Sequence, residues 1–167
     1  MKVKRLEEGE RALAQGRDGD AASNFQLAMT LDPRNTKAKA LFTKSRNAHR
    51  NGKAEELYRR SREALLAEDT KRAAQLLQEA VDCKPTRGKY YSEFAKLINE
   101  HTLQQRVALE HMKKAVEVEP RNLEYTMDLA AAYVDLAMPT NAVRAYERAL
   151  RLDPKNSVAT KALKKLK

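Results

Sequence analysis

AVRAYERALRLDP, residues 142–154, is the stretch that decides the fold. Two of its alanines, Ala142 and Ala149, are seven residues apart with Tyr146 between them, so all three lie on one face of a helix. Small residues on that face let a second helix approach closely, and the large residue fills the space between helical hairpins. Pro154 then ends the helix, because proline lacks an N–H and disfavours helix in the residue before it.

The same pattern occurs four times along the chain, which indicates an internal repeat. Each copy has an alanine, a large apolar residue four positions later, a second alanine three positions further on, and a proline five positions after that. The four copies are Ala21, Phe25, Ala28 and Pro33; Ala73, Leu77, Ala80 and Pro85; Ala108, Met112, Ala115 and Pro120; and Ala142, Tyr146, Ala149 and Pro154. Four positions shared by four copies will rarely arise by chance.

These positions resemble the second helix of the tetratricopeptide repeat (TPR), a helix–turn–helix unit of about 34 residues. The resemblance implies an all-α fold, a right-handed α-solenoid of helical hairpins in one TPR-like domain over residues 1–167. The expected segments are repeat one at 2–35, an extra basic helix at 36–53, repeat two at 54–87, repeat three at 88–122, repeat four at 123–156 and a capping helix at 157–167.

The extra segment, residues 36–53, is too short for a hairpin. Its apolar and small residues recur at helical spacing, which predicts one single helix: Ala38, Leu41, Phe42, Ser45 and His49. This helix either ends at Asn51-Gly52 or runs on into the helix that starts at Ala54. A single helix inserted in this way is similar to the layout of helical-repeat regions in bacterial J-domain and related multi-domain proteins. We therefore also expect the chain to be one region of a larger bacterial multi-domain protein.

The composition favours a folded polar-surfaced protein: 34% of the residues are charged, 42% are hydrophobic and the mean hydropathy is −0.74. No apolar run approaches the roughly 20 residues that span a bilayer, and no apolar segment follows the basic N-terminus as in a signal peptide. The single cysteine, Cys83, has no internal disulfide partner, which favours a reducing, cytoplasmic location.

The net charge of +10 is concentrated in two segments. Residues 34–53 and 155–167 are rich in Lys and Arg and contain no acidic residue. Within the first segment, a basic strip lies on one helical face: Lys39, Arg46, Arg50 and Lys53. Three interpretations stay open for this strip: a solvated helix face, a surface for an acidic partner, or a contact with nucleic acid or an anionic membrane. The 5% of aromatic residues argue against base stacking, and the strip lacks the bulky apolar face of a membrane-surface helix.

The TPR resemblance also implies where a partner would bind, because the first helices of successive hairpins line a concave groove in this family. The groove positions carried over are Glu55, Tyr58, Arg59, Arg62 and Leu66 in repeat two; Lys89, Ser92, Glu93, Lys96 and Asn99 in repeat three; and Glu124, Met127, Asp128, Ala131 and Asp135 in repeat four. The charge of this groove changes from basic to acidic along the chain, so we expect a partner segment with the opposite polarity.

One subclass of the family holds the C-terminal carboxylate of heat-shock chaperones with Lys and Asn in one first helix, Asn in the next, and Lys and Arg in the third. The matching positions here hold Tyr58 and Arg62, then Glu93, then Glu124 and Asp128. Carboxylates stand where cations are required. We therefore expect no carboxylate clamp for chaperone tails.

Motifs for catalysis or for cofactors are missing from the sequence. His49, His101 and His111 form no HExxH pair and have no cysteine neighbour, and we expect His101 and His111 at or near the surface. There is no P-loop, dinucleotide-binding turn or GxSxG elbow. We therefore predict a non-catalytic scaffold without cofactor or metal that binds another protein, with self-association through the incomplete first repeat as a further possibility.

Overall fold

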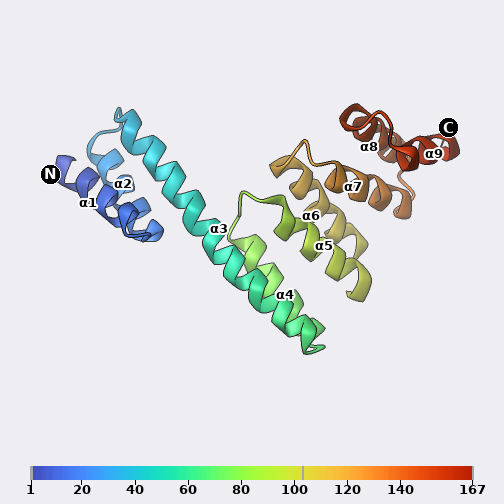
Figure 1. Cartoon of the computed structure of the whole chain (residues 1–167), viewed down its shortest axis with the longest axis horizontal. Coiled ribbons are helices and arrows are strands. Elements are labelled where there is room, and N and C mark those ends of the chain that lie inside the picture. Colours follow the sequence, from blue (N-terminus) through green and yellow to red (C-terminus); the bar gives the residue numbers. More distant parts are fainter. Residues whose placement is uncertain (1, 103, 167) are drawn as a thin grey trace. The chain divides into compact units, whose positions relative to one another are not determined.

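All secondary structure described by the computed structural model, which covers residues 2–102 and 104–166, is helical (Figure 1). The elements are α1 (Lys2–Ala14), α2 (Asp18–Leu31), α3 (Thr36–Leu66), α4 (Thr70–Asp82), α5 (Gly88–Thr102), α6 (Gln105–Val118), α7 (Leu123–Asp135), α8 (Pro139–Leu152) and α9 (Ser157–Leu166). Except for α3, they follow one another as short helices joined by tight connections. The expected all-α class of helical hairpins is confirmed.

The chain divides into two compact units, residues 1–56 and 57–167, and α3 crosses the boundary as one uninterrupted helix of 31 residues. Of the two alternatives for Asn51-Gly52, the structure therefore shows the second, in which the helix runs on. A glycine in a helix interior costs only about 1 kcal/mol relative to alanine, so a single glycine does not end a helix that both units stabilise. No heavy atom lies within 4 Å of the position that a Cβ would occupy at Gly52.

The repeated alanines lie where the hairpins pack, and none of the eight is more than 4% exposed. They are Ala21, Ala28, Ala73, Ala80, Ala108, Ala115, Ala142 and Ala149. The large residue between each pair is also buried, with an exposed fraction of at most 7% for Phe25, Leu77, Met112 and Tyr146. The packing role predicted from the repeat is confirmed, because a larger side chain at the alanine positions would hold the helices apart.

The core of the first unit is centred on Phe25 of α2, which is fully buried. Its ring lies against Gly9 of α1, where a Cβ would stand 2.5 Å from the Phe25 Cε1 atom. Leu41 and Phe42 of α3 pack against the same cluster. Phe25 thus joins three helices, and only glycine at position 9 leaves room for its ring.

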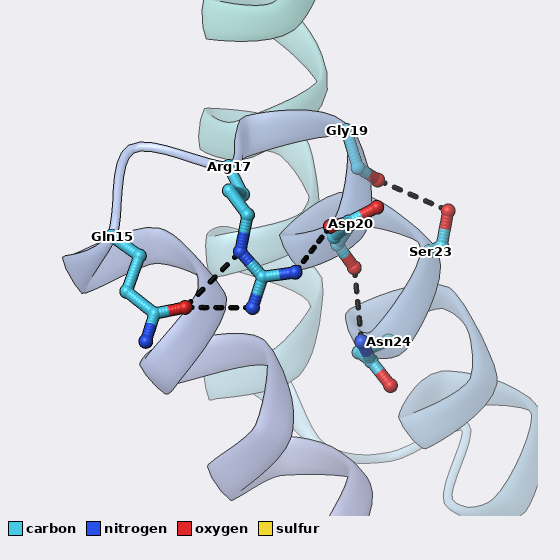
Figure 2. A network of polar contacts seen from close by, with 6 residues as sticks. All are labelled: Gln15, Arg17, Gly19, Asp20, Ser23 and Asn24. Carbon is cyan, nitrogen blue, oxygen red and sulfur yellow. Dashed lines mark hydrogen bonds and ion pairs between the residues drawn. The ribbon is translucent and has the colours of Figure 1, made fainter.

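The turn between α1 and α2 is held by a polar network around Arg17 (Figure 2). Arg17 donates to the Gln15 Oε1 atom at 2.7 Å and to the Asp20 Oδ2 atom at 2.7 Å. Gly16 has a φ of +69°, a left-handed conformation that glycine adopts without steric cost. Side chains of the first turns of α2 add two bonds to backbone carbonyls, Ser23 to Gly19 and Asn24 to Asp20, each at 3.0 Å.

Three of the four connections between hairpins use the same capping device. An asparagine two residues after the proline accepts a hydrogen bond from the backbone N–H three residues further on, which satisfies one open donor of the new helix. The pairs are Asn35 with Ala38 at 2.9 Å, Asn122 with Tyr125 at 3.2 Å and Asn156 with Ala159 at 2.9 Å. The proline thus ends one hairpin and the asparagine begins the next element.

The connection before α5 differs, because position 87 is arginine rather than asparagine. Here the Gly88 N–H donates to the Glu119 Oε1 atom at 2.7 Å, from a residue directly after α6. Gly88 also leaves room for Tyr125, since a Cβ at Gly88 would lie 2.5 Å from the Tyr125 Cε2 atom. The start of α5 is therefore completed by groups from later parts of the chain.

Candidate functional site

Within the second unit, the first helices of the hairpins are α3 from Leu57 onward, α5 and α7. Side chains connect each of them to the next. The Lys89 ammonium of α5 lies 4.9 Å from the centre of the Tyr58 ring of α3, and Lys96 of α5 pairs with two carboxylates of α7. These contacts bring Tyr58, Lys89, Lys96, Glu124 and Asp128, five of the predicted groove residues, into a chain of contacts across the three helices. We call the surface predicted along these helices the groove.

Lys96 is the central charge of the groove. Its ammonium donates to the Glu124 Oε1 atom at 3.0 Å and pairs with the Asp128 Oδ2 atom at 3.1 Å. Partial burial alone would lower the pKa of Lys96, but the two carboxylates outweigh burial and raise this pKa above its usual range. Lys96 therefore stays charged at physiological pH. The pairing ties α5 to α7 and leaves Lys96 little freedom to reach for an anionic ligand.

A cleft of about 160 Å³ opens beside this triad. Five predicted groove residues line it: Lys96, Asn99, Asp128, Ala131 and Asp135. The cleft also has lining residues that were not predicted. Glu100 and Leu136 extend the same helices, and Gln105, Ala108 and Met112 come from α6, whose repeat positions indicated only a packing role. Because four of the five predicted side chains are polar and Asp135 is exposed, this end of the groove suits a cationic or hydrogen-bonding group.

The opposite end of the groove is aromatic and basic. Tyr58 meets Tyr90 edge-on at 5.9 Å between ring centres, and Lys89 lies over both rings. Tyr90 is fully buried and was not predicted as a groove residue. The sequence signal that could have indicated its contact with the groove is its position next to Lys89, a predicted groove residue. Arg62 and Leu66 are exposed on α3, and Leu66 is 86% exposed. Arg59 forms an ion pair with Glu63 on the same helix.

Some predicted groove residues are placed elsewhere. Ser92 is 2% exposed and faces the interior, where its hydroxyl has no hydrogen-bond partner in the described part of the chain. Met127 packs against the core cluster of α7, α8 and α9. Glu93 is half-buried, and Glu55 belongs to the first unit. The periodicity of a first helix cannot separate such inward positions from groove positions when they are neighbours on the helical surface.

The basic strip lies on the part of α3 that belongs to the first unit. Lys39 and Lys53 are exposed, whereas Arg50 and Arg46 are half-buried. The Arg46 guanidinium lies 5.0 Å from the centre of the Phe42 ring, and its Nε atom is buried. The exposed charge of the strip is therefore less continuous than the sequence suggests. The basic tail is on α9 in the second unit, with Lys161, Lys164 and Lys165 exposed; Lys167 lies outside the described residues.

His111 of α6 lies among aromatic side chains of α5. Its ring stacks on Tyr91, with 6.4 Å between ring centres, and meets the edge of Phe94 at 4.8 Å. Burial lowers the pKa of His111 below its ordinary value of 6.5, although the charges of Asp82 and Glu110 act in the opposite direction. A proton on this ring is therefore bound less tightly in the folded protein than in the unfolded chain.

This depressed pKa predicts a loss of stability in mild acid. Below about pH 6.5 the unfolded chain binds a proton at His111 more readily than the folded protein, so the free energy of unfolding falls as the pH is lowered. We expect the urea midpoint to be lower at about pH 5 than at about pH 7.5, and His111→Gln to reduce that difference. His101→Gln, at an exposed position, is the control and leaves the difference unchanged. An equal pH difference in all three proteins would contradict the assignment to His111.

Two further findings concern metal sites and membrane spans among the described residues. Within residues 2–102 and 104–166, no group of three or more His, Cys, Asp or Glu side chains is placed to hold a metal ion. None of the helices described there is long and apolar enough to cross a membrane.

Comparison with known proteins agrees with the helical-hairpin fold. Residues 124–156, which include most of α7 and all of α8, match the family described as Tetratricopeptide repeat. The first TPR of Spaghetti (RPAP3), solved bound to the HSP90 peptide SRMEEVD, is 22% identical with a TM-score of 0.59, over 70% of this chain and 91% of that one. The Arabidopsis OM64 TPR domain is 21% identical with a TM-score of 0.58, over 70% and 96%.

MamA is 15% identical with a TM-score of 0.59, and the match covers 95% of this chain and 81% of that one. No curated protein sequence matches the chain. The repeated alanines, the hairpins that they pack and the match at residues 124–156 lead to one conclusion. Residues 124–156 match a tetratricopeptide repeat, and the chain has the fold of tetratricopeptide repeat domains.

Proposed function

We propose that the chain is a non-catalytic scaffold that binds an extended segment or a helix of a partner protein along the groove of α3, α5 and α7. The observation that carries this proposal is the change of charge along the groove. Arg62, Lys89 and the Tyr58 ring lie at one end, and Asp128 and Asp135 lie beside the cleft at the other. A partner segment with an acidic end and a basic end complements this surface.

The comparisons support the proposal at the level of the fold. One similar TPR domain was solved bound to a peptide of HSP90, which supports peptide binding as the function of this fold here. In the groove of the present chain, Glu124 and Asp128 already neutralise Lys96. We propose a cytoplasmic partner, since a reducing compartment keeps the half-buried thiol of Cys83 free.

A display selection of random peptides on the full chain tests the groove. We expect the selected peptides to carry an acidic and a basic half, and Arg62→Glu or Asp135→Lys to weaken their binding about tenfold, or about 1.4 kcal/mol. Lys39→Glu with Lys53→Glu, on the basic strip, is the matched control and leaves the affinity unchanged. The proposal is wrong if the control abolishes binding while the groove variants retain it.

The peptide SRMEEVD provides a second arm of the same experiment. Its acidic end meets carboxylates at the clamp positions Glu93, Glu124 and Asp128, so we expect a Kd weaker than about 1 mM. Micromolar binding that is lost in Arg62→Glu would instead show that the groove does accept a chaperone tail. That result would overturn the absence of a clamp while leaving the scaffold function intact.

A further inference from the structure

A second cleft, of about 360 Å³, lies on the part of α7 that packs against α8. Thr126, Leu129 and Tyr133 of α7 line it together with Arg144, Arg148 and Arg151 of α8. None of the groove carboxylates of α7 contributes to it. We call it the arginine cleft. It is separate from the groove on which the proposed function rests.

The repeat explains why this cleft is open. Thr126 stands sixteen residues before Ala142, and Leu57 stands sixteen residues before Ala73, so the two occupy equivalent positions in their hairpins. Both residues are buried. Thr126 is the smaller, and its hydroxyl is engaged by the Asn122 backbone carbonyl at 2.9 Å. The fourth hairpin therefore lacks the apolar bulk that leucine supplies in the second, and a hollow remains beside Leu129.

The rim of the cleft is cationic, and its described lining residues include three arginines and no carboxylate. The three arginines recur at intervals of four and three, which places them along one face of α8. No carboxylate lines the cleft, and no ion pair to these arginines occurs within the described residues. Arg148 donates to the Pro120 backbone carbonyl at 2.8 Å, which fixes its guanidinium near the connection between α6 and α7. Arg144 and Arg151, both exposed, remain available to a ligand.

From this combination we infer that the arginine cleft binds an acidic segment of a partner protein, with one apolar or aromatic side chain in the hollow. Guanidinium groups bind carboxylates bidentately, and Leu129 with the Tyr133 ring offers an apolar floor. The volume is near the lower end of that of small-ligand sites, about 300 Å³, which suits one large side chain rather than a whole cofactor. A partner held here leaves the groove accessible to a second segment.

The probe for the experiment is an N-acetylated, C-amidated peptide Glu-Asp-Phe-Glu-Asp, titrated into the full chain and followed by NMR. We expect saturable binding with shifts at residues of α7 and α8, and an affinity at least about tenfold lower in the Arg144→Glu/Arg151→Glu variant. The matched control, Arg60→Glu/Arg106→Glu, makes the same change in net charge at exposed positions outside the cleft and loses less than about threefold. No saturable binding, or an equal loss in both variants, would overturn the proposal.

Thr126→Leu tests the hollow separately from the rim, because it restores the residue found at the equivalent position of the second hairpin. We expect it to weaken binding of the Phe peptide but not of a peptide with glycine in place of phenylalanine. Circular dichroism is the check that Thr126→Leu remains folded. If this variant does not fold, the Arg144→Glu/Arg151→Glu variant still tests the proposal. Displacement of the probe by a duplex DNA oligonucleotide, with shifts at the same arginines and a steep salt dependence, would instead assign the cleft to nucleic acid.

Discussion

Phe25→Ala is expected to unfold the first unit while leaving the second folded. Phe25 is fully buried, and its removal leaves a cavity between α1, α2 and α3. Loss of a buried phenylalanine costs about 3–5 kcal/mol, from lost transfer free energy and from the cavity. A unit of some 56 residues has little stability in reserve, so this loss is comparable with its whole free energy of unfolding.

Amide hydrogen exchange resolved along the chain is the decisive measurement for this variant. We expect protection to be lost in α1 and α2 and to be retained in α7 and α8. The control is Leu27→Ala, on the same helix but 47% exposed, with an expected cost below about 1 kcal/mol. Full protection of α2 in Phe25→Ala would show that the cluster contributes far less than its burial indicates.

Gly52→Pro is expected to break α3 and to cost about 3 kcal/mol or more, because proline removes a backbone hydrogen bond and clashes with the preceding turn. The matched control is Gly52→Ala. It has no neighbour within 4 Å of the new Cβ and replaces a flexible residue by the best helix former, so it is expected to stabilise the protein by about 1 kcal/mol.

The two variants also report on how the units are coupled. While α3 is continuous, unfolding of one unit frays a helix that the other shares, so we expect their urea transitions to overlap. In Gly52→Pro each unit should unfold at its own midpoint, and exchange should accelerate around residues 48–56. Identical unfolding curves for the proline and alanine variants would mean that the continuity of α3 has no energetic role.

The repeat positions could be predicted because they are local. The spacing of Ala142, Tyr146 and Ala149 specifies one helical face, and burial of small residues on that face follows from close packing. The continuity of α3 could not be decided in this way. Asn51-Gly52 disfavours helix by an amount smaller than the packing of the segments on either side of it, and that packing is a tertiary property.

The groove was harder to predict for a related reason. Lys96, Glu124 and Asp128 were all expected there, but their mutual pairing depends on how α5 and α7 lie, which no periodicity encodes. Ser92 shares the face by spacing but is buried. The arginine cleft could not be predicted from the sequence. Its signal is one threonine, Thr126, at a position where the second hairpin has leucine, and a smaller side chain at one position forms no recognisable motif.

The bond between the Gly88 N–H and Glu119 has a consequence for the order of events during synthesis. The other new helices after a proline are capped by an asparagine that leaves the ribosome just before them, whereas α5 depends on a carboxylate 31 residues downstream. Tyr125, which fills the space above Gly88, emerges later still. The third hairpin is thus completed only when the fourth has begun to leave the ribosome. In a chain paused before Glu119, the Gly88 N–H at the start of α5 lacks this hydrogen-bond acceptor.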